Sequence, residues 1–247
     1  MKRTAIRLLL ALGIIFTFTT CSKDHLFDCL TSTGNTIYQW RNVGKFTNLN
    51  LQNDVDVVLY FDTTNFIRVT AGEHLIDGII TELSGNTLYI RNENRCNWVR
   101  SFKNQYVVEI GMDSITKIDT YGAGNITCHD TITCHDFYFD AWNATGTANF
   151  LFHNQYIHLN NNVGRVDIHA AGRTDVAFGN IADVGTLDAK NLSCDLWYFR
   201  TNSTGDSHLT ANNTLEAEIQ YTGNVYYSGA ATNVRRTGSG SGMLIRE

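Results

Sequence analysis

The stretch that decides the fold is a short motif that recurs: YGAGNI at residues 121–126, ATGTANF at 144–150, NVGRVDI at 162–168, DVGTLDA at 183–189, STGDSHL at 203–209, YTGNVYY at 221–227 and GSGSGML at 238–244. Each copy places a glycine a few residues before apolar side chains. The glycines in register are Gly124, Gly146, Gly164, Gly185, Gly205, Gly223 and Gly240, so the spacings are 22, 18, 21, 20, 18 and 17 residues. A repeat near twenty residues with very short strands is typical of a β-solenoid.

A repeat of this length cannot bury its own apolar side chains. Stacking one repeat on the next aligns the inward side chains and pairs the backbone of each repeat with its neighbours. Glycine suits the corner because a tight turn there needs a positive φ. The expected inward residues are Ile118, Ile126, Phe139, Phe150, Leu159, Ile168, Phe178, Leu187, Leu196, Leu209, Leu215, Ile219, Val225 and Leu244. We therefore expect an all-β, parallel β-helix-like stack; the alternative is an antiparallel β-sandwich, which does not explain the sustained spacing.

The chain before the repeats is also rich in strand signals. Alternating or β-branched segments lie at 47–51, 55–61, 66–71, 87–92 and 105–110, bounded by Gly, Asn or Asp. Residues 73–83 could form about one turn of helix, which Gly78 would keep short. Proline is absent and no low-complexity linker marks a boundary. We expect one all-β domain over 37–247, with a first strand-rich part at 37–113 and repeats at 114–247.

The N-terminus has the pattern of an export signal. Three basic residues within the first seven precede an apolar run that is too short to span a bilayer. Small polar residues then lead to Cys21, as a lipoprotein signal peptidase requires. We expect a signal peptide at 1–20, lipidation of Cys21 and a polar tether at 21–36. Ordinary cleavage or an uncleaved anchor is the alternative.

The net charge limits the classes of partner, and the cysteines bear on the oxidising compartment that an export signal implies. Loss of the leader with Lys2, Arg3 and Arg7 leaves 16 basic and 24 acidic residues, a net charge near minus eight. This charge disfavours nucleic acid and offers no basic patch for anionic lipid. In an oxidising compartment thiols tend to pair, and our first choice is a disulfide between Cys29 and Cys96.

No segment carries a strong catalytic or cofactor motif. ITCHDTITCHD at 126–136 supplies Cys128, His129, Cys134 and His135, weak candidates for a Zn²⁺ site, but neighbouring residues of a strand point to opposite faces. We therefore expect no metal. A polysaccharide-cleaving enzyme on such a fold uses clustered acidic residues, and the candidates here are Asp119, Asp140, Asp167 and Asp188. They are expected at strand ends, where aspartate commonly forms turns. We expect neither a catalytic residue nor a cofactor.

Aromatic residues are the remaining candidates for binding. Exposed Trp and Tyr beside Asn and Asp could stack on a sugar and hydrogen-bond to it. The weak candidates for such a site are Trp142, Trp197, Tyr221, Tyr226 and Tyr227. The competing interpretation is that these rings fill the core or cover strand edges.

Four segments of the sequence are informative together: FTNLNLQNDVDVVLYF at 46–61, RVTAGEHLIDGIITELSGNTLYIRN at 68–92, YGAGNI at 121–126 and YTGNVYYSGAATNVRRTGSGSGML at 221–244. In these segments and their order the chain resembles the auto-transporter adhesin, head GIN domain family, and the resemblance covers about residues 43–245. It implies an all-β, solenoid-like fold, an envelope location, an adhesive role and no catalytic residues to carry over. The segments around Cys29 and Cys96 also resemble a subgroup in which these two cysteines pair.

Taken together, these features favour a non-catalytic cell-envelope lipoprotein, held by its lipid at the outer membrane, that binds or scaffolds a glycan or an envelope protein. The alternative is a polysaccharide-active lyase or hydrolase on a β-helix fold. The two differ in one respect, because an enzyme needs a groove of convergent charged side chains.

Overall fold

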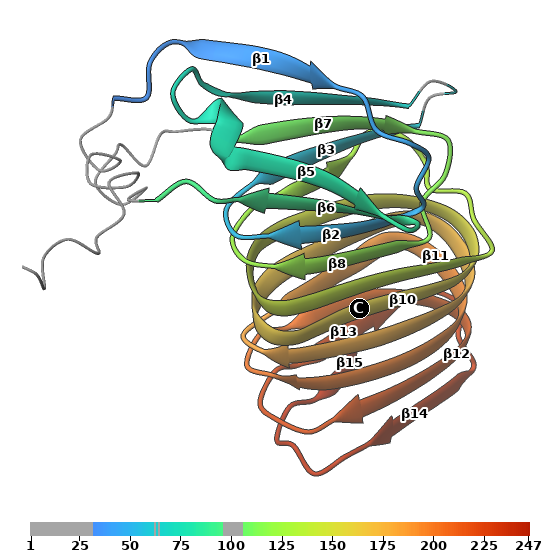
Figure 1. Ribbon diagram of the computed structural model, residues 1–247. Helices are drawn as coiled ribbons and strands as arrows, with labels where there is room; N and C mark the ends of the chain where they lie inside the picture. Colours follow the sequence, from blue (N-terminus) through green and yellow to red (C-terminus); the bar gives the residue numbers. More distant parts are fainter. Residues whose placement is uncertain (1–31, 62, 64, 96–105) are drawn as a thin grey trace, which may run out of the picture. The chain divides into compact units, whose positions relative to one another are not determined.

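The computed structural model describes residues 32–61, 63, 65–95 and 106–247 of the 247-residue chain (Figure 1). The chain divides into two compact units. The first comprises residues 1–32 and 95–102, nearly all of which lie outside the described residues. The second comprises residues 33–94 and 103–247, and the following account concerns it alone.

The described part of the second unit is built almost wholly of β-strands, which confirms the expected all-β class. The strands are β1 (Thr36–Arg41), β2 (Asn48–Gln52), β3 (Asp56–Phe61), β4 (Phe66–Gly72), β5 (Ile79–Ser84), β6 (Thr87–Asn92), β7 (Val107–Met112), β8 (Lys117–Tyr121), β9 (Ile126–Cys128), β10 (Asp136–Asp183), β11 (Thr186–Ser203), β12 (Ser207–Ile219), β13 (Val225–Ser228), β14 (Asn233–Thr237) and β15 (Leu244–Arg246). The expected turn of helix is a short 3₁₀ helix, η3 (Ile76–Gly78), after which the chain becomes β5.

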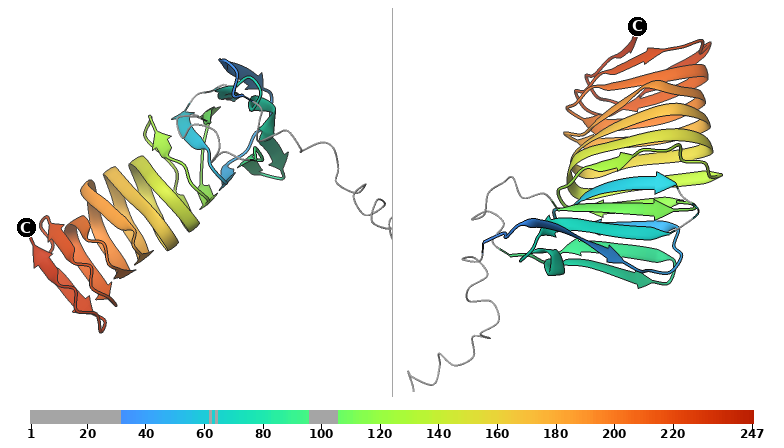
Figure 2. Two further views of the ribbon diagram at one scale, coloured as in Figure 1. Left: turned by 90° about the vertical axis from the view of Figure 1, so that its left-hand side faces the viewer. Right: turned by 90° about the horizontal axis from the view of Figure 1, so that it is seen from above.

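From β8 to the C-terminus, neighbouring repeats pair in parallel. Tyr138 lies opposite Lys117, Phe178 opposite Tyr198, and Leu187 opposite Ser207, so partners are about twenty residues apart in sequence. β10 and β11 are long because pairing continues through the corners of each repeat. Figure 2 shows the ribbon from β10 onward advancing in one direction toward the C-terminus, which lies at the end formed by β14 and β15.

The first part of the unit departs from the expected parallel stack. β1 pairs with β4, β4 with β7, and β5 with β6, and all three pairs are antiparallel. β2 pairs with β6 and β3 with β7 in parallel, so the sheet is mixed, and the expectation of a parallel stack is wrong only for the antiparallel pairs. The turn at Gly85, with φ +58°, joins β5 directly to β6, and such a short connection can only join antiparallel strands.

The recurring glycines meet one another across the repeats. A Cβ on Gly146 would overlap the carbonyl oxygen of Gly124, and a Cβ on Gly223 would overlap that of Gly205. Gly146 also has φ +131°, whereas Gly223 does not have a positive φ. Glycine is therefore required at position 223 because two backbones approach closely there, and not because of the turn conformation.

The interior is a single cluster of inward side chains from all the repeats. Of the expected inward residues, those buried are Ile118, Ile126, Phe139, Phe150, Leu159, Ile168, Leu187, Leu209, Leu215, Ile219 and Val225. Leu244 packs partly buried against the cluster. Phe178 and Leu196 were expected inside, but both are only half-buried. Their neighbours Ala177 and Trp197 point inward instead.

Candidate functional site

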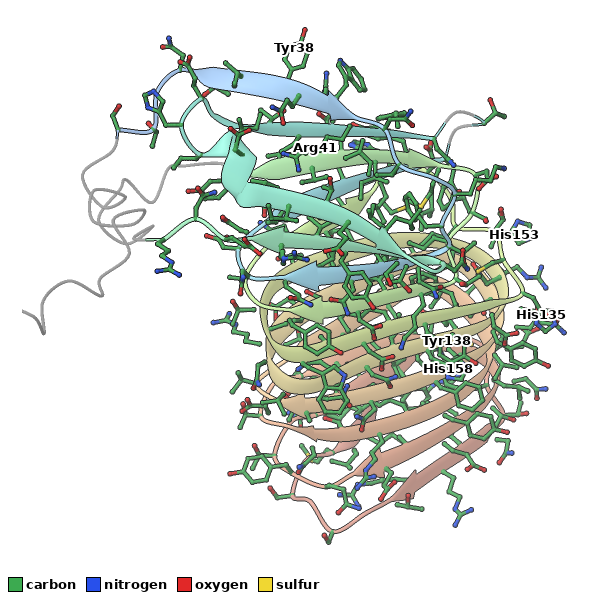
Figure 3. All side chains as sticks on the ribbon, in the orientation of Figure 1. Tyr38, Arg41, His135, Tyr138, His153 and His158 are labelled. Atoms are coloured by element: carbon green, nitrogen blue, oxygen red, sulfur yellow. The ribbon has the colours of Figure 1, made fainter. Side chains whose placement is uncertain are left out.

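Four aromatic rings form a continuous stack on the outside of the sheet. The ring centroids of Tyr138 and His158 are 4.3 Å apart, those of His158 and Phe178 4.6 Å, and those of Phe178 and Tyr198 5.3 Å. The planes of neighbouring rings are within 15° of parallel. Figure 3 labels Tyr138 and His158 lying next to each other on this face. We call these four residues the aromatic ladder.

The register of the strands produces the ladder. Parallel strands lie about 4.8 Å apart, so identical positions of successive repeats bring flat side chains to stacking distance. Phe178 lies directly opposite Tyr198. Beyond the two ends, the same row continues with Lys117 opposite Tyr138 and Glu216 opposite Tyr198.

A polar row runs beside the ladder, two residues further along each strand. It contains Asp140, Asn160, Asn180 and Arg200. The amide of Asn160 donates to Asp140 at 2.9 Å, and the guanidinium of Arg200 lies 3.7 Å from the carboxylate of Glu218. Because alternate residues of a strand share a face, ring edges and hydrogen-bonding groups are presented side by side to solvent.

Stacking leaves most ring faces covered, so a ligand can reach a face only where the stack ends. Tyr198, which is 41% exposed, ends the ladder at a hollow of about 230 Å³. Arg200, Glu216 and Glu218 also line this hollow. The end of the ladder therefore combines an exposed tyrosine ring with charged groups of both signs.

Within the ladder, burial between its neighbours lowers the pKa of His158, and the nearby carboxylates of Asp136 and Asp140 oppose this effect. The lowered pKa favours the neutral imidazole. A neutral ring stacks between Tyr138 and Phe178 without bringing a charge into a half-buried row.

A second aromatic surface lies on β1, β3, β4 and β7. Trp40 contacts the edge of Phe66, with centroids 5.7 Å apart, and Phe66 lies 6.3 Å from Tyr60. Tyr60 in turn stacks on His129 at 4.9 Å. These rings border a hollow of about 440 Å³, which also contains Arg68 paired with Glu109.

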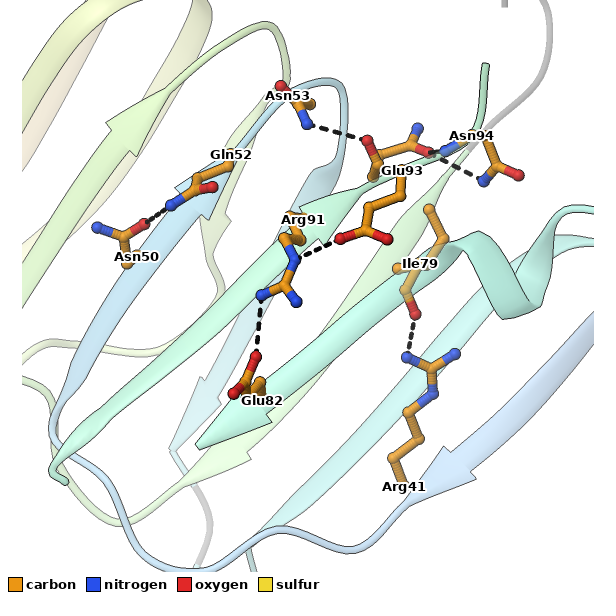
Figure 4. A network of polar contacts seen from close by, with 10 residues as sticks. Arg41, Asn50, Gln52, Asn53, Ile79, Glu82, Arg91, Glu93 and Asn94 are labelled. Carbon is orange, nitrogen blue, oxygen red and sulfur yellow. Dashed lines mark hydrogen bonds and ion pairs between the residues drawn. The ribbon is translucent and has the colours of Figure 1, made fainter. Parts of the chain in front are cut away.

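A polar network holds the strands of the first part in place (Figure 4). Arg41 donates to the backbone carbonyls of Ile76 and Ile79, which ties β1 to η3 and β5. Burial lowers the pKa of Arg41, and the carboxylate of Asp77 opposes this. Arg91 bridges Glu82 and Glu93. Since these groups satisfy one another, we assign the network a structural role.

The five aromatic residues singled out in the sequence do not form one site. Trp197 is wholly buried, so it cannot lie at a binding surface, and Tyr227 is half-buried and packs against the core. Trp142 is 44% exposed, and Tyr221, 50% exposed, lines a separate hollow of about 450 Å³. Tyr226 is half-buried and stacks on His208 at 4.8 Å.

The sequence did not single out the aromatic ladder or the rings around Trp40. The available signal for the ladder was an aromatic or histidine residue at positions 138, 158, 178 and 198, a spacing of twenty residues that matches the glycine repeat. That signal was obscured because Phe178 was assigned to the interior.

The cysteine and the histidine of each Cys–His pair have different surroundings. Cys128 is buried and Cys134 half-buried, and each thiol lies near the backbone carbonyl two residues further on. His129 stacks on Tyr60, and His135 contacts Asp136 and Tyr156 on the outside. Among the described residues, no three His, Cys, Asp or Glu side chains are grouped as a metal site would need.

The four aspartates lie in two separate places. Asp119 lies opposite Asp140 beside Lys117, whose ammonium is 3.0 Å from Asp119 and 3.9 Å from Asp140. The other place contains Asp167, which accepts a hydrogen bond from Thr186, and Asp188, which lies opposite His169. The four carboxylates are therefore not brought together.

Three predicted residues fall outside the described part of the chain: the lipidation candidate Cys21 and the disulfide candidates Cys29 and Cys96. Within the described part, Cys128, Cys134 and Cys194 are free thiols. No helix among the described residues has the length and apolar character needed to cross a membrane.

Solved structures with similar folds come from Bacteroides and Parabacteroides species. A putative adhesin from Bacteroides fragilis superposes with a TM-score of 0.78 at 16% sequence identity, covering 86% of this chain and 97% of that one. A putative lipid binding protein from Parabacteroides distasonis gives 0.66 at 16% identity, with 87% and 98% covered. A putative adhesin from Parabacteroides merdae gives 0.64 at 14% identity, again with 87% and 98% covered. At these identities the likeness concerns the fold alone.

The sequence itself also matches a family model. No curated protein matches closely enough to count as a relative. The model described as "Putative auto-transporter adhesin, head GIN domain" matches residues 45–231, which include the strands from β2 to β13 and the whole aromatic ladder but not Trp40. The chain belongs to this auto-transporter adhesin, head GIN domain family.

Proposed function

We propose that this protein is a non-catalytic binding module of the bacterial cell envelope, whose partner is a glycan or an envelope protein that docks on the aromatic ladder. The observation that carries the proposal is the row of Tyr138, His158, Phe178 and Tyr198, stacked in register on the outside of the sheet. Family membership supports a role in binding. An evenly spaced row suits a partner that is itself extended.

The scaffold for this role is, in our proposal, a β-solenoid in residues 114–247. Parallel pairing at intervals of about twenty residues and the contacts between recurring glycines support it. Each repeat shares backbone hydrogen bonds with both neighbours, so outward side chains are held with little freedom. A rigid surface loses little conformational entropy when it binds.

The proposed location is the outer membrane, through a lipid on Cys21 after removal of residues 1–20. Support comes from the basic and apolar leader and the small polar residues before the cysteine. A clickable palmitate analogue fed to expressing cells should label the protein, and Cys21→Ser should abolish the label. Retention of label in Cys21→Ser would contradict this anchor.

A disulfide between Cys29 and Cys96 would tie the N-terminal tether to the domain. We propose it because both cysteines lie in polar segments outside the repeats. Mass spectrometry of the unreduced, digested protein should show the two peptides linked, and reduction should separate them. Two separate peptides before reduction would contradict the pairing.

The experiment that tests the function is a screen of glycans and envelope proteins against the purified protein and two variants. Tyr198→Ala removes the exposed ring at the end of the ladder, and Tyr121→Ala removes a tyrosine of similar exposure elsewhere. We expect Tyr198→Ala to weaken binding of any partner by about tenfold, as loss of a stacked aromatic contact does. Tyr121→Ala should bind like the original protein. Equal binding by all three would contradict the ladder as the site.

The same screen tests the rival reading of a polysaccharide-active enzyme. Asp119 and Asp140 lie opposite each other and Lys117 pairs with both, whereas Asp167 and Asp188 lie elsewhere, beside Thr186 and His169. We therefore expect no turnover of any polysaccharide in the screen. Release of oligosaccharide products would overturn the non-catalytic assignment.

A further inference from the structure

The hollow beside Trp40 is built differently from the ladder, because ring faces and polar groups border one concave space. Its volume is about 440 Å³, within the range of small-molecule sites. The residues that line it are Trp40, Tyr60, Phe61, Phe66, Arg68, Glu109 and Asp130. They come from β1, β3, β4, β7 and the segment after β9, and all belong to the second unit.

The rings in this hollow stand at an angle to one another and so keep open surfaces. The planes of Trp40 and Phe66 are inclined by 72°, which forms a corner rather than a stack. Trp40 is 60% exposed although it lies within this cluster. Gly111 makes room for the corner, since a Cβ there would overlap the ring of Phe66.

The polar groups of the hollow are fixed in position. Arg68 donates two hydrogen bonds to Glu109, one to each carboxylate oxygen, so these two charges cancel. Asp130 accepts from the backbone amide of Phe61 through Oδ2 at 2.9 Å. This bond holds the carboxylate of Asp130 at the border of the hollow, where its oxygens are hydrogen-bond acceptors.

We propose that this hollow is a binding site for a neutral saccharide. The ring of Trp40, 60% exposed although the guanidinium of Arg68 lies over part of it, matches the apolar C–H face of a sugar. Asp130, Glu109 and Arg68 match its hydroxyl groups. This site lies on strands that contribute nothing to the ladder, so the inference goes beyond the proposed function and does not depend on it.

Other ligand classes fit the hollow less well. The guanidinium of Arg68 already lies 5.7 Å from the Trp40 ring centroid, so a ligand cation would meet a resident positive charge. An anion would face the carboxylates of Glu109 and Asp130. An acyl chain would have to cover the Arg68–Glu109 pair and Asp130 without hydrogen-bonding to any of them.

Fluorine NMR of the full protein labelled with 5-fluorotryptophan tests the site directly. The chain has four tryptophans, and Trp40→Phe identifies the Trp40 resonance by its disappearance. The probes are maltose, cellobiose, lactose and N,N′-diacetylchitobiose, each raised to about 50 mM, well above a millimolar dissociation constant. We expect at least one probe to shift the Trp40 resonance saturably. Trp142, also exposed, and Trp197, buried, serve as internal controls.

Two variants separate this site from the ladder. Asp130→Asn keeps an acceptor for the Phe61 amide but removes the charge. It should raise the dissociation constant of the probe about tenfold, as loss of a charged hydrogen bond does. Tyr198→Ala should leave the Trp40 shift unchanged. The proposal is overturned if no probe shifts the Trp40 resonance, or if Trp142 shifts equally. If Tyr198→Ala abolished binding of a partner but left the Trp40 shift unchanged, that partner would bind the ladder and not this hollow.

Discussion

Trp197 fills the interior opposite small residues of the preceding repeat. It pairs in register with Ala177, and Gly179, two residues along, leaves space for Phe199. The indole nitrogen donates to the backbone carbonyl of Thr210 at 3.1 Å, so its one polar group is satisfied. Large and small side chains thus alternate from repeat to repeat at this level of the core.

Trp197→Ala should therefore be among the most damaging single changes. Removing the indole leaves a large cavity and an unpaired carbonyl, and we expect a loss of about 3–5 kcal/mol in the free energy of unfolding. Urea denaturation followed by circular dichroism measures it. Trp142→Ala, at an exposed position, should cost less than about 0.5 kcal/mol. Similar losses for the two variants would contradict the placement of Trp197.

The three free thiols of the repeats should be unreactive in the folded protein. Burial raises the pKa of Cys128 and Cys194 to about 12, and that of Cys134 to about 11. At about pH 8 almost no thiolate is then present to react. Iodoacetamide followed by peptide mass spectrometry should find these cysteines unmodified until denaturant is added. Rapid alkylation of Cys128 or Cys194 in the native protein would contradict their burial.

His158 should make the stability of the protein depend on pH. Burial lowers its pKa below the ordinary value of 6.5, so the unfolded chain takes up a proton more readily than the folded one. Stability from this group is present above pH 6.5 and is lost as the pH falls through the folded pKa. His158→Phe keeps a ring in the ladder and removes the titration. Between about pH 7.5 and about pH 5, urea unfolding should show a smaller loss for His158→Phe than for the original protein.

An equal loss for the two proteins would mean that His158 titrates alike in the folded and unfolded chains. Every other titrating group is shared, so their contributions cancel in this comparison. The test therefore isolates the environment of one ring in the ladder.

At the residue scale, the sequence predicted which side chains are inward wherever apolar and polar residues alternate. It failed where apolar residues are consecutive. In LWYF at 196–199, either Leu196 and Tyr198 or Trp197 and Phe199 could face the core. The choice depends on the irregular register between Cys194 and Leu196, and on the small residues in the repeat before. Neither is visible in the local pattern.

At the scale of the element, the glycine corners can be tested as contacts between repeats. Gly223→Ala would place a Cβ against the carbonyl oxygen of Gly205, so two backbones would have to separate. Gly85→Ala has nothing within 4 Å of the new atom and suffers only from its φ of +58°. We expect Gly85→Ala to cost about 1 kcal/mol and Gly223→Ala clearly more. Thermal unfolding of the two variants provides the comparison.

If Gly223→Ala cost no more than Gly85→Ala, the close approach of the Gly205 and Gly223 backbones would not be what requires glycine at this corner. The spacing of these glycines was visible in the sequence because a contact between backbones tolerates no other residue. The antiparallel pairing of β5 with β6 was not foreseen. The Ser-Gly-Asn turn at 84–86 that joins them is a local feature which the search for a long repeat passed over.

At the scale of the whole described unit, stability should fall from the middle toward the C-terminal end. β11 is paired on one side with β10 and on the other with β12. Among the described residues, β15 pairs only with β13, and β14 only with β12. An element with one neighbour loses fewer contacts when it opens, so its opening costs less free energy.

Native-state hydrogen exchange measured by mass spectrometry should reveal this gradient. Amides of β14 and β15 should exchange through local opening while those of β11 remain protected up to global unfolding. Val225 is fully buried beneath the last repeat, so protection should rise sharply on passing from β15 to β13. Equal protection of β11 and β15 would instead mean that the unit opens all at once. A gradient would place the aromatic ladder, which ends on β11, in the part of the molecule that holds its shape longest, as a rigid binding surface requires.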